Sequence, residues 1–371
     1  MLGGMAELAR GLAGHLATTD RLSLYCLPKC GIEGPWQLAG ELSGRPGRDI
    51  NRLRAAERSE SPPDLWLAMN AGLVPLAHRL ERPFFAYFHG NDFTNPWLAC
   101  GPGLLEAVRR PYASRIRHPL RRRAIAQALP KVRHLFTNSH QTAKLIHQRL
   151  GQTSSRVSVV HPGVGDAFFQ DIEATATDEA IFSPLEILTV TRLSSHTRRK
   201  NVDGVLRALA RLEADVRYTV VGDGDDRPRL QALAQELGLA DRVTFAGKVD
   251  LEELLAAYRQ ADLFILASKA TADDVEGFGI VYIEASASGV PAMCSRAGGA
   301  TDAVVDGVNG LQIDDSSPAS IAAGIERFRA ERRSFLPQKA RDFAEEFRWP
   351  KIATQLRDGL LAHLPSPPSG R

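Results

Sequence analysis

The stretch that decides the fold is residues 262–291, DLFILASKATADDVEGFGIVYIEASASGVP. Its apolar run 263–267 predicts a strand that is buried on both faces, because no polar residue alternates within it. After a polar loop comes Glu276, and from Ile280 the apolar residues follow helical spacing until Gly289. Glu276 is therefore expected at the carboxyl end of a parallel strand, which is where open α/β sheets bind ligands.

The same stretch predicts an anion-binding site. Glu284 lies eight residues after Glu276, about one turn into the expected helix. The first N–H groups of a helix have no partner within the helix and suit a phosphate. Two carboxylates would then flank an anion. Taken alone, each carboxylate has another interpretation: Glu284 as a solvated helix-face residue, and Glu276 as a charge that complements the helix dipole.

Length and composition limit the class of protein. A chain of 371 residues exceeds one ordinary core, which predicts two domains. Apolar residues make up 44% and charged residues 24%, as in globular proteins, and no apolar run approaches the ~18 residues of a membrane span. The four cysteines are scattered, and the chain opens without the pattern of a signal peptide. We therefore expect a cytoplasmic protein with reduced thiols.

The amino-terminal half opens with Gly3-Gly4, followed by an expected helix over 5–16 and a strand over 22–27. An α/β domain normally begins with a buried strand, and two glycines before a helix are typical of a strand-loop-helix unit. We therefore expect the true start to lie upstream; the alternative is a domain that lacks its first strand. Segment 28–60 is polar and is predicted to be a loop with no more than one short helix.

A histidine in this half is a candidate ligand-binding residue. His89 directly follows a strand predicted over 84–88 and precedes Gly90. That position would place its side chain at a ligand crevice, although a surface-loop or capping histidine fits the same pattern. Other strands of this half are predicted over 64–69, 134–139 and 157–160.

Residues 107–165 contain no acidic residue, while Lys and Arg recur throughout. In a chain with 46 basic and 43 acidic residues, such a run creates a local positive field. We expect segment 109–156 to contact an anionic membrane surface, at ~1 kcal/mol per basic residue. A solvated helix face is the alternative. Nucleic acid is not an expected partner, because no motif interleaves aromatic and basic residues.

The second domain is expected after an acidic linker, 166–183, and opens with a buried strand over 185–190. Arg192 follows this strand, and Lys200 precedes the next helix. Two cations at a strand end and a helix start would hold a pyrophosphate. Strands and helices then alternate strictly, which predicts a doubly wound parallel sheet.

One glycine-rich stretch of this domain needs separate treatment. Gly222-Asp223-Gly224 lacks the third glycine of a dinucleotide-binding motif, and its acidic residues imitate an Asp-x-Asp metal motif. We interpret it as a tight turn. No cluster of metal ligands occurs elsewhere in the sequence.

Together these features resemble glycosyltransferase family 4, which are retaining enzymes of the two-domain GT-B fold. Glu276 and Glu284 fit the E-x7-E element of that family. The other matches are Arg192 with Lys200, His89-Gly90, Gly3-Gly4, Gly298-Gly299 and segment 306–310. The resemblance implies two Rossmann-like doubly wound domains facing a central cleft: 1–165 on the acceptor side, the linker 166–183, the nucleotide-sugar domain 184–345, and a helix in 346–371 that crosses back to the first domain before a frayed tail.

The implied activity is that of a metal-independent hexosyltransferase. Its donor would be a UDP- or GDP-linked sugar, with no other cofactor, and its acceptor a glycan or a lipid-linked sugar in polysaccharide or glycolipid synthesis at the inner membrane face. The implied catalytic residues are His89, Arg192, Lys200 and Glu276. The implied donor-binding residues are Gly3, Gly4, Gly222, Phe278, Gly279, Ile280 and Glu284.

One departure from the family pattern, and the function itself, leave alternatives open. The loop from Arg192 to Lys200 is longer than the commonest version, so Arg198 or Arg199 could replace the lysine. This spacing resembles some phosphatidylinositol-mannosyltransferase-like members, which favours a lipid-linked acceptor. A non-hydrolysing nucleotide-sugar epimerase of the same fold, or a non-catalytic nucleotide-sugar-binding protein, is the alternative function.

Overall fold

The structure is a computed structural model. It describes residues 4–21, 23–26, 37–41, 46–90, 118–169, 184–212, 215–271 and 275–365. The chain divides into two compact units. The amino-terminal unit consists of Leu2–Gly163 together with Trp349–Arg371, and the carboxyl-terminal unit is Val164–Arg348.

The amino-terminal unit contains a four-stranded parallel sheet in the order β3-β4-β5-β6 and a separate parallel pair, β1-β2. The strands are β1 Ser23–Cys26, β2 Gln37–Glu41, β3 Trp66–Ala68, β4 Phe84–Phe88, β5 Val132–Thr137 and β6 Val157–Val159. The helices are α1 Gly4–Leu16, α2 Pro46–Glu57, α4 His118–Ala128, α5 His140–Leu150 and α13 Trp349–Ala362, with short 3-10 helices at Ala71–His78, Leu129–Lys131 and Ser154–Arg156.

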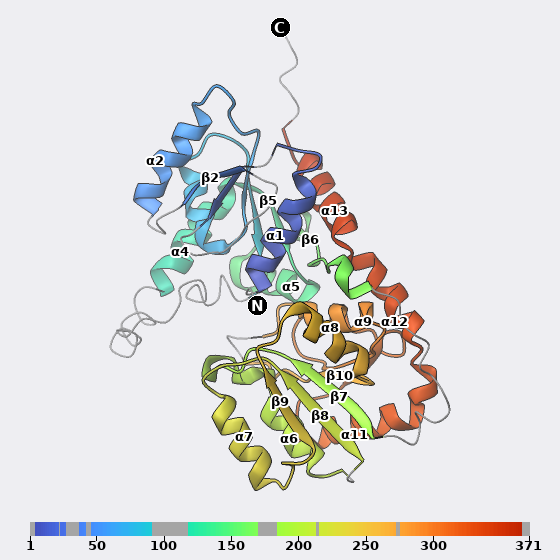
Figure 1. Cartoon of the computed structure of the whole chain (residues 1–371). Coiled ribbons are helices and arrows are strands. Elements are labelled where there is room, and N and C mark those ends of the chain that lie inside the picture. Colours follow the sequence, from blue (N-terminus) through green and yellow to red (C-terminus); the bar gives the residue numbers. More distant parts are fainter. Residues whose placement is uncertain are drawn as a thin grey trace. The chain divides into compact units, whose positions relative to one another are not determined.

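Helices from opposite ends of the chain cover one face of this sheet. Leu8 and Leu12 of α1 pack with Leu356 of α13 and with Phe85 of β4 in a single core (Figure 1). Trp349, at the start of α13, is 7% exposed in that core. A Cβ on Gly11 would lie 2.2 Å from the Trp349 ring, so only glycine allows this contact.

Segment 28–60 was expected to be a loop with no more than one short helix. Strand β2, which was not expected, lies within it, and so does helix α2, of twelve residues. Pro46 occupies its first position, where the missing N–H is not needed.

The carboxyl-terminal unit contains a six-stranded parallel sheet. Its strands are β7 Leu185–Val190, β8 Val216–Val221, β9 Val243–Gly247, β10 Leu263–Leu266, β11 Ala292–Ser295 and β12 Gly310–Ile313. The helices are α6 Val202–Leu209, α7 Arg227–Glu236, α8 Leu251–Gln260, α9 Ile280–Ala287, α10 Ala300–Ala303, α11 Pro318–Glu331 and α12 Pro337–Ala344. Short 3-10 helices occur at Asp166–Phe169, Ser195–Lys200, Arg332–Ser334 and Glu345–Phe347.

The strand order is β12-β11-β10-β7-β8-β9, which is the doubly wound order with its reversal between β7 and β10. Successive residues of a strand enter opposite cores. Ile187 and Ile265 pack with α6, α7 and α11, whereas Leu188 and Phe264 pack with α8, α9 and α12 (Figure 1). The expected fold class, two parallel α/β sheets with helices on their faces, is confirmed.

The segment expected as a linker begins with ordered structure. Asp166–Phe169 form a 3-10 helix, and Phe169 is buried in the core shared by β10 and α9. Residues 170–183 lie outside the described residues. Among the described helices, none is both long and apolar enough to cross a membrane.

Candidate active site

The candidate site lies where the strand order reverses. β7 and β10 are neighbours in the sheet, and the chain leaves both at the same edge. The segment after β7 carries Arg192 to Lys200, and the segment after β10 carries Ser268 and Glu276. At such a reversal the connections that follow the two strands run to opposite faces of the sheet, which leaves a crevice beyond the carboxyl ends of the strands.

Glu276 is the centre of a cluster of polar side chains. Its Oε2 atom accepts hydrogen bonds from Lys200 Nζ at 2.5 Å, from an Arg199 guanidinium nitrogen at 3.1 Å and from Ser268 Oγ at 3.2 Å. The Glu276 side chain is 8% exposed, so these bonds form largely away from water. Burial raises the pKa of Glu276, but the charges of Lys200 and Arg199 outweigh it and lower that pKa to about 2. Glu276 is therefore ionised at neutral pH.

Two glycines bring the chain against the backbone of Glu276. Gly298 has φ +73°, and a Cβ there would lie 2.6 Å from the Glu276 carbonyl oxygen. The Gly299 N–H donates to that same oxygen at 2.7 Å. The Gly298-Gly299 pair thus fixes where the Glu276 backbone lies.

The loop after β7 decides which cations reach Glu276. Ser195 donates through its N–H and its hydroxyl to Asp225, at 3.0 and 2.5 Å. Arg198 pairs with Asp226 at 2.8 Å. These contacts hold Arg198 away from the carboxylate, and only Arg199 and Lys200, of the three consecutive cations, contact Glu276.

Asn201 holds the end of this loop, a role that the sequence pattern did not indicate. It adopts φ +61°, the one described non-glycine residue with a left-handed backbone. Its side-chain amide donates to the carbonyls of Ala267 and Ser316 at 2.9 and 2.8 Å. An asparagine directly before a helix is the only sequence signal for such a turn.

The second carboxylate lies on α9. Glu284 is partly exposed, and its Oε2 accepts a hydrogen bond from the Tyr258 hydroxyl at 2.9 Å. Helix α9 begins at Ile280, directly after Gly279, whose φ is +84°. Phe278 is 2% exposed and packs against Phe347, so only its backbone is available to a ligand.

The remaining predicted residues are more dispersed. Arg192 is exposed, yet close enough for its charge to contribute to the lowered pKa of Lys200, of which burial is the main cause. Gly222 follows β8 with φ +135°, and a Cβ there would overlap the Thr191 carbonyl oxygen at 1.8 Å. Gly4 is the first residue of α1, and Gly3 lies outside the described residues.

His89 belongs to the amino-terminal unit and follows β4 directly. One ring nitrogen is 2.9 Å from the Met69 carbonyl oxygen, and the ring lies 5.1 Å from that of Tyr87. These contacts orient the side chain at the carboxyl edge of the four-stranded sheet.

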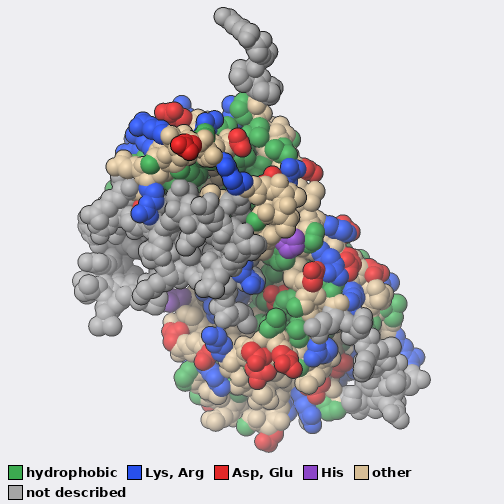
Figure 2. Space-filling model, turned by 45° about the horizontal axis from the view of Figure 1, so that its top comes forward, with side chains coloured by type: hydrophobic (Ala, Val, Ile, Leu, Met, Phe, Trp, Pro, Cys, Tyr) green, Lys and Arg blue, Asp and Glu red, His purple; other side chains and the backbone are tan. Residues whose placement is uncertain are grey.

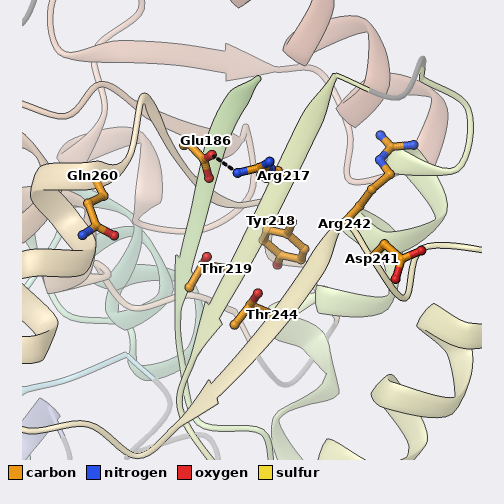
Figure 3. Close-up of a pocket in the computed structure, with 8 residues that line it drawn as sticks. All are labelled: Glu186, Arg217, Tyr218, Thr219, Asp241, Arg242, Thr244 and Gln260. Atoms are coloured by element: carbon orange, nitrogen blue, oxygen red, sulfur yellow. Dashed lines mark ion pairs between the residues drawn. The ribbon is translucent and has the colours of Figure 1, made fainter. Parts of the chain in front are cut away.

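A hollow of about 440 Å³ lies at the opposite edge of the six-stranded sheet. Figure 3 shows its lining, in which Glu186 and Arg217 form an ion pair at 3.7 Å beside Thr219 and Thr244. All these residues lie near the amino ends of their strands. Open α/β sheets bind ligands beyond the carboxyl ends of their strands, so this hollow is not the candidate active site.

Segment 109–156, which was predicted to be a basic surface, exposes several of its described Lys and Arg side chains. Among its described residues, the exposed cations are Arg122, Arg123, Lys131, Arg133, Lys144 and Arg149. Arg156 differs, because its guanidinium donates to the backbone carbonyls of Leu129 and Val132. Residues 109–117 lie outside the described residues. Elsewhere, basic and acidic side chains are interspersed over the visible surface (Figure 2).

Two family models match this chain. The model named glycosyl transferases group 1 matches residues 177–348, and the model named glycosyltransferase family 4 matches residues 3–168. Together they span most of both units.

Individual relatives agree with these matches. The GDP-mannose-dependent alpha-(1-6)-phosphatidylinositol monomannoside mannosyltransferase of Mycolicibacterium smegmatis is 28% identical over 89% of this chain and 87% of its own. The D-inositol 3-phosphate glycosyltransferase of the same organism is 31% identical over 80% of this chain and 63% of its own. The crystal structure of Anabaena HepE in complex with UDP superposes with a TM-score of 0.73 over 98% of this chain and 97% of that chain, at 19% identity.

Proposed function

The chain belongs to the glycosyl transferases group 1 family, that is, the family 4 glycosyltransferases of the GT-B fold. From that premise we propose that it transfers a hexose from a nucleoside-diphosphate sugar to a lipid-linked or glycan acceptor, with retention of the anomeric configuration. The observation that carries the proposal is the contact between Lys200 and Glu276 at the sheet reversal, with Glu284 on the helix that follows. This arrangement supplies cations for a diphosphate and carboxylates for hydroxyl groups.

The cations would act on the leaving group. When the bond from sugar to phosphate breaks, negative charge develops on the departing diphosphate. Lys200 and Arg192 would stabilise that charge, which is the kind of interaction that lowers a barrier most. The first N–H groups of α9, at Ile280, would add partial positive charge to the same anion.

The carboxylates would hold the donor. Glu276 is ionised and fixed through Oε2, so it would accept a hydrogen bond from a hydroxyl of the transferred sugar. Glu284, partly exposed on α9, would accept hydrogen bonds from the ribose hydroxyls.

Retention would follow a front-face route. The acceptor hydroxyl would bond to the anomeric carbon on the face that the diphosphate leaves, and its proton would pass to a phosphate oxygen. This route needs no second carboxylate facing Glu276, unlike a retaining glycosidase pair, whose carboxyl groups lie about 5 Å apart.

The acceptor is proposed to be lipid-linked, at the inner membrane face. One relative supports this choice, because its name specifies a phosphatidylinositol monomannoside. Another is named for D-inositol 3-phosphate, which shares the inositol phosphate headgroup but carries no lipid. The exposed cations of segment 118–149 would attract an anionic headgroup.

The test uses the full chain with GDP-mannose, UDP-glucose and ADP-glucose, each with phosphatidylinositol monomannoside, with D-inositol 3-phosphate, or without acceptor. Mass spectrometry follows the transfer products, and ligand-observed NMR follows donor binding and any epimerisation of the donor sugar. Glu284→Ala is compared with Glu252→Ala, an exposed glutamate of α8. We expect one donor to yield a glycosylated acceptor and free diphosphate, with loss only in Glu284→Ala. Interconversion of the donor sugar without transfer would instead identify an epimerase. Failure of every donor to bind would overturn the proposal.

A further inference from the structure

We infer that Tyr258 is a positioning residue that fixes the carboxylate of Glu284 and thereby sets the preference of the site for ribose over deoxyribose. The inference rests on the proposed role of Glu284 in donor binding. Tyr258 lies on α8, in a part of the sequence that carries no motif of the site.

The contact joins two helices that cover the same face of the sheet. The Tyr258 hydroxyl donates to Glu284 Oε2 at 2.9 Å and lies 3.4 Å from the Val281 carbonyl oxygen, one turn earlier on α9. Tyr258 is 0% exposed, whereas Glu284 is partly exposed. A buried donor therefore holds one oxygen of a carboxylate that solvent, and hence a ligand, can reach.

The ring of Tyr258 has little freedom to move. It packs edge-on against Phe168 at 5.8 Å between ring centres and lies 6.0 Å from the ring of Phe264 on β10. Interiors are packed densely enough that such a ring keeps one rotamer. The hydroxyl thus occupies a fixed point beneath Glu284.

The protonation state of the Tyr258 hydroxyl suits a hydrogen-bond donor. Burial and the neighbouring Glu284 charge raise the pKa of Tyr258 well above its ordinary value, so the hydroxyl keeps its proton at all working pH values.

Fixing Glu284 matters because a free glutamate side chain loses rotamer entropy when it binds a ligand. Contacts from neighbouring residues that hold a ligand-binding side chain in place remove that entropy cost before the ligand arrives. The gain applies only to ligands whose hydroxyls Glu284 contacts. A nucleotide that lacks one ribose hydroxyl keeps only part of this contact. Removal of the Tyr258 hydroxyl should therefore weaken the binding of ribonucleotides more than that of their deoxy counterparts.

Calorimetric titration tests this with UDP and GDP and with their 2′-deoxy and 3′-deoxy counterparts. Wild type, Tyr258→Phe and Tyr218→Phe are compared. Tyr218 is the matched control, since its buried hydroxyl donates to Thr189 Oγ1 at 2.8 Å in the other core of the same sheet. Thermal unfolding establishes that each variant is folded.

We expect wild type and Tyr218→Phe to share one ribose preference. In Tyr258→Phe this preference should fall by about tenfold, because ribonucleotide binding weakens more than deoxyribonucleotide binding. Equal weakening of ribo- and deoxyribonucleotides by Tyr258→Phe, or an unchanged preference, would overturn the inference and leave the proposed function standing. Failure of wild type to bind any of these nucleotides would overturn the proposed function, and the inference with it.

Discussion

Lys200 Nζ lies 2.5 Å from Glu276 Oε2, and this contact joins the segment after β7 to the segment after β10. The two strands are neighbours at the reversal of the sheet, so two residues 76 positions apart in the sequence meet in one site. Either charge alone would be costly to bury. Together with Arg199 and Ser268 they form a satisfied polar network, which defines the position of the carboxylate.

Replacement of Lys200 and replacement of Arg198 should have different effects on kcat. Lys200→Met removes a charge that contacts Glu276, whereas Arg198→Met removes one that pairs with Asp226. We expect Lys200→Met to lower kcat by ~100-fold or more, as loss of a preorganised electrostatic group does, and Arg198→Met to remain close to wild type. Steady-state kinetics with the donor that the transfer assay identifies provides the measurement. Equal losses in both variants would contradict the assignment of Lys200.

Stability should depend on the ionisation of Glu276. Its pKa is lowered from 4.5 to about 2 in the folded protein, so the unfolded chain binds the proton first as the pH falls. The stabilisation is present above about pH 4.5 and is lost toward pH 2, with a total of about 3 kcal/mol. Urea unfolding between pH 7 and 2 should show this extra loss in wild type but not in Glu276→Gln. Parallel pH profiles for the two proteins would show that the pair is not coupled to folding.

Gly298 should be intolerant of a side chain for a reason beyond its backbone angle. Gly298→Ala would place a Cβ 2.6 Å from the Glu276 carbonyl oxygen, whereas Gly307, with a similar φ of +75°, has open space around its Cβ position. Both alanines carry left-handed strain of about 1 kcal/mol. We expect Gly298→Ala to lose at least a further ~1 kcal/mol and to weaken donor binding. Similar unfolding free energies for the two variants would exclude the clash.

Much of the carboxyl-terminal unit could be predicted because its pattern is local. The apolar run before Ser268 and the helical spacing after Gly279 are features of one short stretch, and the structure has β10 and α9 there. The position of Glu276 after a buried strand follows from the same stretch.

The other parts depend on partners that are distant in the sequence. Which of three consecutive cations contacts Glu276 is decided by Asp225 and Asp226, which lie after another strand. Tyr258 looks like an ordinary apolar-face residue of α8, because only the fold brings it to Glu284. No periodicity within either segment encodes these contacts.

The last prediction concerns the amino-terminal unit, where His134 of β5 stacks on His363, which follows α13. Their ring centres are 3.7 Å apart, and His134 Nε2 lies 2.8 Å from Ser158 Oγ. Burial, with contributions from the His363 and Arg156 charges, lowers the pKa of His134 from 6.5 to about 4. The unfolded chain therefore binds a proton between pH 6.5 and 4 that the folded protein does not, and stability must fall across that window by about 3 kcal/mol. Chemical unfolding at pH 7 and pH 4 should show this loss in wild type and in His78→Gln, whose histidine is exposed, but not in His134→Gln. If all three proteins lost the same stability, the histidine stack would play no part in the acid sensitivity of this unit.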